Sequence, residues 1–176
     1  MDQNEVDVLE ALEKAIRSSK LDDRLADSTA RIEQRLEGQP EDVMAWETIP
    51  LEAFESALPD AIKSCWIFIL RANTTTGAER HPNSHQRSMS IRGSGDFQTR
   101  PDEAWESHQL SSDPHVPIDR RWLSIPMNVW HQLVVPDENW VLISFHTVAE
   151  DELVEERPSE GMDDGVRQMK YAERER

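Results

Sequence analysis

Apolar residues in the first part of the chain recur at spacings of three and four, which is the pattern of an amphipathic helix. The two apolar stripes consist of Val6, Leu9, Leu12 and Ile16, followed by Leu25, Ile32 and Leu36. They predict one helix over about 4–18 and a second over about 22–37, which Gly38 and Pro40 would end. We expect both helices to pack on the outside of the main domain or across a dimer.

After Pro59 the pattern changes to short runs rich in β-branched and aromatic residues, separated by Asn, Gly, Pro and Asp. The runs span 64–72, 85–93, 96–100, 105–110, 120–126, 130–136 and 139–148. Short strands at this spacing, with no helical stretch between them, predict an antiparallel sandwich or barrel rather than βαβ units.

The chain is therefore expected to divide into a helical N-terminal extension over 1–59, a β-barrel over 60–148 and an acidic tail over 149–176. The tail is poor in large apolar residues, so we expect at most one edge strand, around Leu153 and Val154, before it becomes flexible.

Charge separates the same three segments. The net charge of −16 is made up of −10 over 1–60, −1 over 61–148 and −5 over 149–176. The nearly neutral middle segment is where a core can form. The acidic flanks repel phosphate backbones and anionic lipids, so we expect neither nucleic acid nor a membrane as a partner.

The single cysteine, Cys65, excludes an intramolecular disulfide and favours a reducing compartment. The acidic N-terminus has no apolar stretch typical of a secretory signal, and the longest apolar run, 65–70, is far shorter than a membrane helix requires. A cytoplasmic protein is the resulting expectation.

Two segments of the β-rich region carry candidate chemistry: 77–95 reads GAERHPNSHQRSMSIRGSG and 126–131 reads PMNVWH. Together they resemble the two signature motifs of the cupin superfamily. With Gly93 as the closing glycine of the first motif, Gln86 falls where the family has Glu, and His81 falls on its second His. The first His position is occupied by Glu79.

In the second motif Pro126 and His131 match the family, and Asn128 replaces a glycine. Asn is the residue that best tolerates a left-handed backbone after Gly, so this change is mild. The resemblance covers about 70–148. It implies a mainly β fold, the double-stranded β-helix or jelly-roll barrel, with an N-terminal α-helical extension and a metal held by side chains from facing strands.

Strand geometry is compatible with the same site. Glu79 and His81 are two residues apart and point to one face of a strand. A turn at 82–84 would bring Gln86 back beside them, and His131 would come from another strand. Two imidazoles and one carboxylate are typical of mononuclear non-heme iron, so the expected cofactor is Fe²⁺, with Zn²⁺, Ni²⁺ or Mn²⁺ as alternatives.

A second strand register remains open. If Gln86 faces the pocket, Ser88, Ser90 and Arg92 line it with Gln86, which would suit an anion. If His85 faces inward instead, Met89 and Ile91 line the barrel and the ligands become three histidines. The motif spacing favours Gln86, whereas the apolar pattern favours His85. A barrel that has lost its metal is the structural alternative to both.

Other side chains are candidates for holding a substrate. Arg71, Arg87 and Arg92 could clamp an anion, although strand arginines are more often exposed. Trp130 could form a wall of the pocket, and His146 could face it, although a hydrogen-bonded interior histidine is the commoner case.

The resemblance does not name a reaction, because the fold hosts oxygenases, isomerases, epimerases and binding modules. The ligand set favours a metal-dependent oxygenase or related oxidoreductase acting on a small polar organic molecule. The alternative is a non-catalytic ligand-binding or sensor module. A metal-free epimerase using a His–Tyr pair ranks third, because Tyr171, the only tyrosine, lies in the tail. Exposed sheet edges lead us to expect a homodimer.

Overall fold

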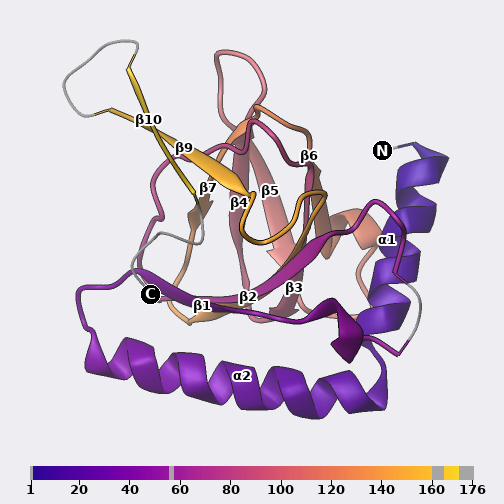
Figure 1. Ribbon diagram of the computed structural model, residues 1–176. Coiled ribbons are helices and arrows are strands. Elements are labelled where there is room, and N and C mark those ends of the chain that lie inside the picture. The colour runs from indigo at the N-terminus through magenta and orange to yellow at the C-terminus, as the bar shows by residue number, and fades with distance from the viewer. Residues whose placement is uncertain (1, 56–57, 160–164, 171–176) are drawn as a thin grey trace.

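The computed structural model describes residues 2–55, 58–159 and 165–170 (Figure 1). Two helices, α1 (Gln3–Ile16) and α2 (Ser19–Gly38), precede the strands, and short 3₁₀ turns lie at Leu51–Ala53 and Ile118–Arg120. The strands are β1 (Met44–Thr48), β2 (Ser64–Leu70), β3 (Gln86–Arg92), β4 (Ser94–Arg100), β5 (Glu106–Ser111), β6 (Trp122–Ile125), β7 (Trp130–Val134), β8 (Trp140–His146), β9 (Val154–Pro158) and β10 (Val166–Lys170).

The strands form two facing sheets and one hairpin, and neighbouring strands within each of them pair antiparallel. One sheet has five strands in the order β1-β2-β8-β3-β6, the other has three in the order β5-β4-β7, and β9 pairs with β10. The mainly β fold with a helical extension is thus the one that the sequence predicted.

The five-stranded sheet is buried on both faces. Its outer face packs against α1 and α2, of which α2 runs along β1 in Figure 1, and its inner face packs against the three-stranded sheet. Each of the seven residues of β8 is buried, as expected for a strand covered on both sides. Trp140 on the inner face also passes so close to Gly95 that any side chain there would clash with its ring.

Three features differ from the sequence expectation. The segment 1–59, predicted as a helical extension, contains β1, which forms an edge of the five-stranded sheet. The tail forms two strands, β9 and β10, where at most one was expected. On β3, Met89 and Ile91 pack against the cluster that includes the helices, so they do not line the space between the sheets.

Neither helix of the described residues has an apolar stretch long enough to cross a membrane. Both are amphipathic, and α1 buries Leu9, Leu12, Ala15 and Ile16 against the sheet. Asp2 caps the start of α1 by accepting a hydrogen bond from the Glu5 backbone amide.

The attachment of α1 includes a charged cluster at its first turn. Glu5 accepts hydrogen bonds from Arg87 Nε at 2.7 Å, from Arg87 Nη2 at 2.8 Å and from Ser124 Oγ at 2.6 Å. Burial alone would raise the pKa of Glu5, but the hydrogen bonds from Arg87 and Ser124 outweigh it and lower that pKa. Arg87, one of the candidate anion clamps, therefore binds the helix instead.

We predict that Glu5→Gln lowers the free energy of unfolding at neutral pH by about 2 kcal/mol, because a hydrogen bond to a charged group contributes about 1.5–3 kcal/mol. Since the folded-state pKa is lowered, this contribution is complete above the ordinary value of 4.5 and is lost as pH falls through the lowered value. Urea unfolding at several pH values measures it, with the exposed Glu10→Gln on the same helix as control. Equal losses in both variants at neutral pH would contradict the prediction.

Candidate metal centre

Two of the candidate ligands lie next to each other because their backbones pair. Glu79 and His131 exchange hydrogen bonds in both directions, with Glu79 N to His131 O at 2.9 Å and His131 N to Glu79 O at 2.8 Å. The same pairing continues to His81, whose carbonyl accepts from Asn128 N at 3.0 Å. Asn128 has a φ of 65°, the left-handed conformation expected at a position where the motif has glycine.

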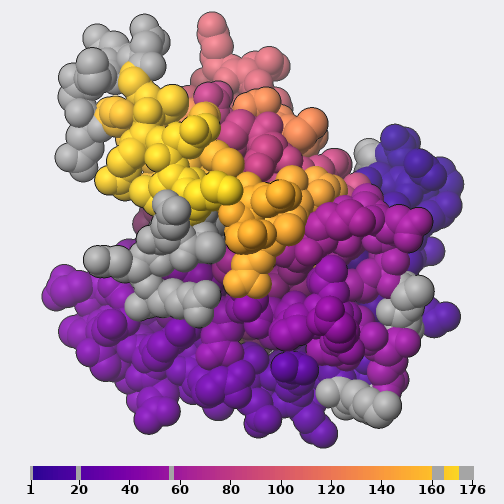
Figure 2. Space-filling view, in the orientation of Figure 1, coloured from indigo at the N-terminus to yellow at the C-terminus, as the bar shows by residue number. Residues whose placement is uncertain are grey.

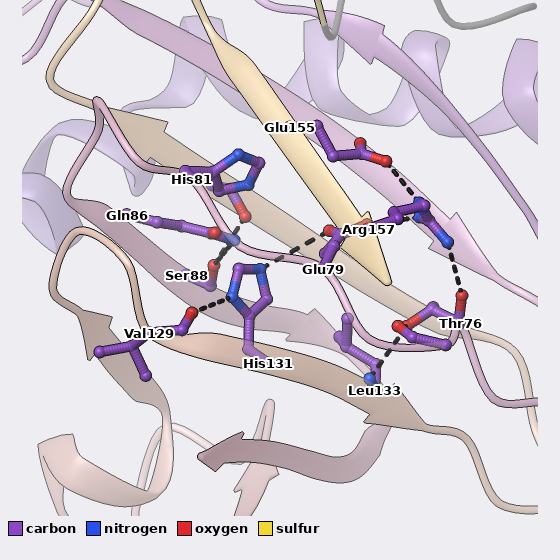
Figure 3. Close-up of polar contacts among 12 residues, drawn as sticks. Thr76, Glu79, His81, Gln86, Ser88, Val129, His131, Leu133, Glu155 and Arg157 are labelled. Carbon is purple, nitrogen blue, oxygen red and sulfur yellow. Dashed lines mark hydrogen bonds and ion pairs between the residues drawn. The ribbon is translucent and has the colours of Figure 1, made fainter. Parts of the chain in front are cut away.

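Glu79, His81 and His131 each offer one ligand atom, and these atoms all lie within 4.8 Å of one another. Each of the three residues is at most 6% exposed. His131 Nε2 is 3.6 Å from Glu79 Oε1, and the rings of His81 and His131 have their centroids 5.3 Å apart. Figure 3 shows these side chains converging inside the barrel.

Both imidazoles are oriented by backbone carbonyls. His81 Nδ1 is 2.9 Å from the Val154 carbonyl, and His131 Nδ1 is 3.1 Å from that of Val129. A carbonyl can only accept, so each Nδ1 carries the proton and the lone pair of each ring lies on Nε2. Metal-binding histidines are usually fixed in this way.

Burial lowers the pKa of two histidines, His81 and His146. Desolvation, followed by the nearby His131, lowers the pKa of His81 to about 4, although Glu79 acts in the opposite direction. Desolvation and the same two histidines hold the pKa of His146 well below its usual range. A neutral imidazole is the form that binds a metal, so no proton has to leave His81 at neutral pH.

Gln86 lies in this group and His85 does not. Gln86 is 6% exposed and lines, with Glu79 and Ser144, a cavity of about 20 Å³ whose other walls are apolar. His85 points outward, with Nε2 2.6 Å from Ser124 Oγ, and lines an outer cleft of about 620 Å³. The structure thus has the register that the motif spacing favoured, because the Met89 face of β3 is covered by the helices.

The fit of this group to a metal can be tested on its polar atoms. Among the described residues, neither Gln86 Oε1 nor His131 Nε2 has a hydrogen-bond partner, although both atoms are buried. Buried polar atoms are normally paired, because leaving one unpaired costs about 1–3 kcal/mol. A cation bound by His131 Nε2 together with Glu79 and His81 would give that nitrogen a partner, so the residues present fit a divalent metal.

His146 lies at the edge of the group. Its ring packs edge-on against that of His81, with centroids 5.1 Å apart, and its Nδ1 is 3.3 Å from Ser84 Oγ. It is 1% exposed and stands opposite Gln86 across the β3–β8 pairing. His146 therefore adjoins the candidate ligands without belonging to the set of three.

The remaining substrate-binding candidates lie elsewhere. Arg71 donates to the carbonyls of Leu36, Gln39 and Asp42, so it binds the end of α2. Arg92 pairs with Glu33 on the same helix. These two arginines stabilise helix packing and do not face the site.

Ser90 and Trp130 also have structural contacts. Ser90 accepts from Trp140 Nε1 at 2.9 Å and donates to the Gly93 carbonyl at 3.0 Å, close to the turn into β4. Trp130 neighbours His131 on β7 and stacks under Arg80, whose guanidinium carbon is 4.6 Å from the ring centroid.

Sequence reasoning missed the contribution of β9. Arg157 Nη2 is 2.5 Å from Glu79 Oε2, and Arg157 Nε is 2.5 Å from Glu155 Oε1. Glu155 is completely buried. The only signal in the sequence is the charged triplet at 155–157, which directly follows the edge strand expected around Leu153 and Val154.

No protein-family model matches the sequence, and no curated protein matches it. Solved structures match through their fold. Coconut cocosin has 16% identity and a TM-score of 0.51 over 66% of this chain and 29% of its own. A salicylate 1,2-dioxygenase mutant from Pseudoaminobacter salicylatoxidans, in complex with gentisate, has 16% identity and a TM-score of 0.50 over 70% and 32%.

Pumpkin pro-11S globulin has 17% identity and a TM-score of 0.50 over 65% of this chain and 28% of its own. The match spans about a third or less of each of these proteins. At such identities the similarity concerns the fold alone. Since these neighbours are cupin-fold proteins, this chain has the cupin fold.

Proposed function

We propose that this protein is a mononuclear metal-dependent oxygenase or related oxidoreductase that acts on a small polar organic molecule. The observation that carries the proposal is the buried set of two imidazole nitrogens and one carboxylate within 4.8 Å of one another. Such a set, with open positions, is typical of non-heme Fe²⁺ oxygenases. The same fold carries a dioxygenase in one of the structures compared above.

The chain's own residues prepare the site in three ways. Backbone carbonyls hold the two rings with Nε2 toward the site, and Glu79 places an oxygen beside them. Gln86 adds a neutral oxygen as a fourth ligand. A bound divalent metal would act there as a Lewis acid that leaves coordination positions open to a small molecule.

Apolar side chains form most of the walls of the remaining space. The cavity beside Glu79 and Gln86 is walled by Phe68, Phe97, Leu133 and other apolar residues. Low polarity around a charged centre strengthens each electrostatic interaction inside it. We propose Fe²⁺ as the metal because mixed nitrogen and oxygen ligands suit it, with Zn²⁺, Ni²⁺ or Mn²⁺ as alternatives.

A non-catalytic binding or sensor module is the second candidate, and the cavity size favours it. About 20 Å³ accommodates a species the size of water, whereas pockets for organic ligands usually measure about 300–1,000 Å³. An oxygenase would therefore require the walls of the site to move when substrate enters, whereas a module that binds only the metal would not.

The metal site predicts that added Fe²⁺ or Zn²⁺ stabilises the protein. At a free concentration 100 times the Kd, binding to the folded state alone adds about 2.7 kcal/mol to the free energy of unfolding. His131→Ala removes a ligand and should abolish most of this gain. Thermal unfolding with and without metal measures it, and the exposed His115→Ala is the matched control. A wild-type protein whose melting temperature is insensitive to both metals would argue against the site.

Oxygenase activity predicts oxygen uptake by protein reconstituted anaerobically with Fe²⁺ when a substrate from the small acids, thiols or catechols is added. The uptake should disappear in His131→Ala and persist in His115→Ala, because only the first lacks a ligand. If none of these compounds causes uptake while the metal or one of the compounds still binds tightly, the non-catalytic binding or sensor module replaces the oxygenase.

A further inference from the structure

β9 is attached to the segment that carries two of the three candidate ligands. Arg80 and Glu156 exchange backbone hydrogen bonds of 3.0 and 2.9 Å, and their side chains form an ion pair at 2.7 Å. Two residues earlier in β9, the Val154 carbonyl orients His81. Figure 1 shows β9 crossing beside the barrel, and Figure 2 shows β9 and β10, in yellow, on the surface of this face.

Arg157 extends this attachment to the carboxylate ligand. Its guanidinium bridges Glu79 Oε2 and Glu155 Oε1, each at 2.5 Å, and donates through Nη1 to the Thr76 carbonyl at 3.2 Å (Figure 3). The exposed fractions of the three charged side chains are 18% for Arg157, 8% for Glu79 and 0% for Glu155. The rigid guanidinium fork therefore fixes the orientation of Glu79 in a low-dielectric environment.

This orientation separates the two oxygens of Glu79. Oε2 is bound by Arg157, whereas Oε1 lies 3.6 Å from His131 Nε2, on the side where the ligand atoms converge. Without Arg157 the carboxylate could rotate, and two buried carboxylates would lose the cation between them. Buried charges that lose a partner are strongly destabilised.

We propose that Arg157 is a positioning residue that holds Glu79 Oε1 toward the two histidines, so that metal binding and the docking of β9 are coupled. The inference rests on the proposed metal site and adds a regulatory element to it. Val154 and Arg157 both belong to β9, and they contact the ligands His81 and Glu79. Detachment of β9 from the segment 79–81 would therefore free one imidazole and one carboxylate together. Coupling between two equilibria is reciprocal, so metal must stabilise docked β9 by as much as docking favours metal.

The first test is Zn²⁺ affinity, measured by calorimetry on the full chain. We expect Arg157→Gln to weaken binding by about 10–100-fold, the usual effect of removing a residue that orients a metal ligand. Arg157→Lys should restore part of the affinity, because Lys supplies a charge but cannot bridge two carboxylates. The exposed Arg167→Gln on β10 is the control and should bind as the wild type does.

In Arg157→Gln the buried Glu155 loses the guanidinium of Arg157, so this variant could fail to fold. A double variant therefore keeps the test decisive. Glu155→Gln combined with Arg157→Gln removes both charges together, and Glu79 still lacks its anchor. We expect this variant to fold and to bind Zn²⁺ as weakly as the single variant. Wild-type affinity in the double variant, or in folded Arg157→Gln, would overturn the inference and leave the metal site itself intact.

The reciprocal effect is measured on the wild type by hydrogen exchange of residues 150–158. If Zn²⁺ binds only when β9 is docked, free Zn²⁺ at 100 times its Kd should make the detached state of β9 about 100-fold rarer. Amide hydrogens that exchange only in that state should then exchange about 100-fold more slowly. Zn²⁺ that binds without changing this exchange would overturn the coupling alone. A wild-type chain that binds no Zn²⁺ would overturn both the coupling and the proposed function.

Discussion

The short segment 79–81 is held by backbone hydrogen bonds along both of its edges, and the candidate metal centre depends on this placement. One edge pairs with His131 and the other with Glu156 of β9. Since alternate residues of an extended segment share a face, Glu79 and His81 point the same way, toward His131. A slip of one residue in either pairing would turn both ligands away from the site.

Charge balance imposes the second constraint. A carboxylate as buried as Glu79 needs compensation, and Arg157 supplies part of it from a segment far along the chain. His81 meets the same constraint by remaining neutral, as its lowered pKa shows. Gln86, which stands where the cupin motif has Glu, adds an oxygen without adding charge. Because Glu79 stands where the motif has His, the four positions still include one carboxylate, as in the usual motif, and Arg157 pairs with that carboxylate.

The sequence predicted most of the fold and the ligand group, for physical reasons that can be identified. Apolar spacing revealed both helices, and turn residues revealed the strands of the barrel. The sequence could not decide between Gln86 and His85, because both faces of β3 are buried. The alternation of apolar and polar residues then does not distinguish the face in the barrel interior from the face covered by the helices. Arg71 and Arg92 were misplaced because their partners belong to α2, a tertiary contact that no local pattern encodes. An edge strand was expected where β9 lies, but its contribution to the site was not, because the charges of β9 are paired internally.

The most direct measurement is a crystal structure of the Zn²⁺-loaded protein with anomalous data at the zinc edge. We expect one strong anomalous peak between Glu79, His81 and His131, about 2.0–2.2 Å from the two Nε2 atoms and one carboxylate oxygen. We also expect Arg157 still to contact the other oxygen of Glu79 in that structure. A peak confined to surface carboxylates, with the three side chains arranged as they are without metal, would contradict this expectation.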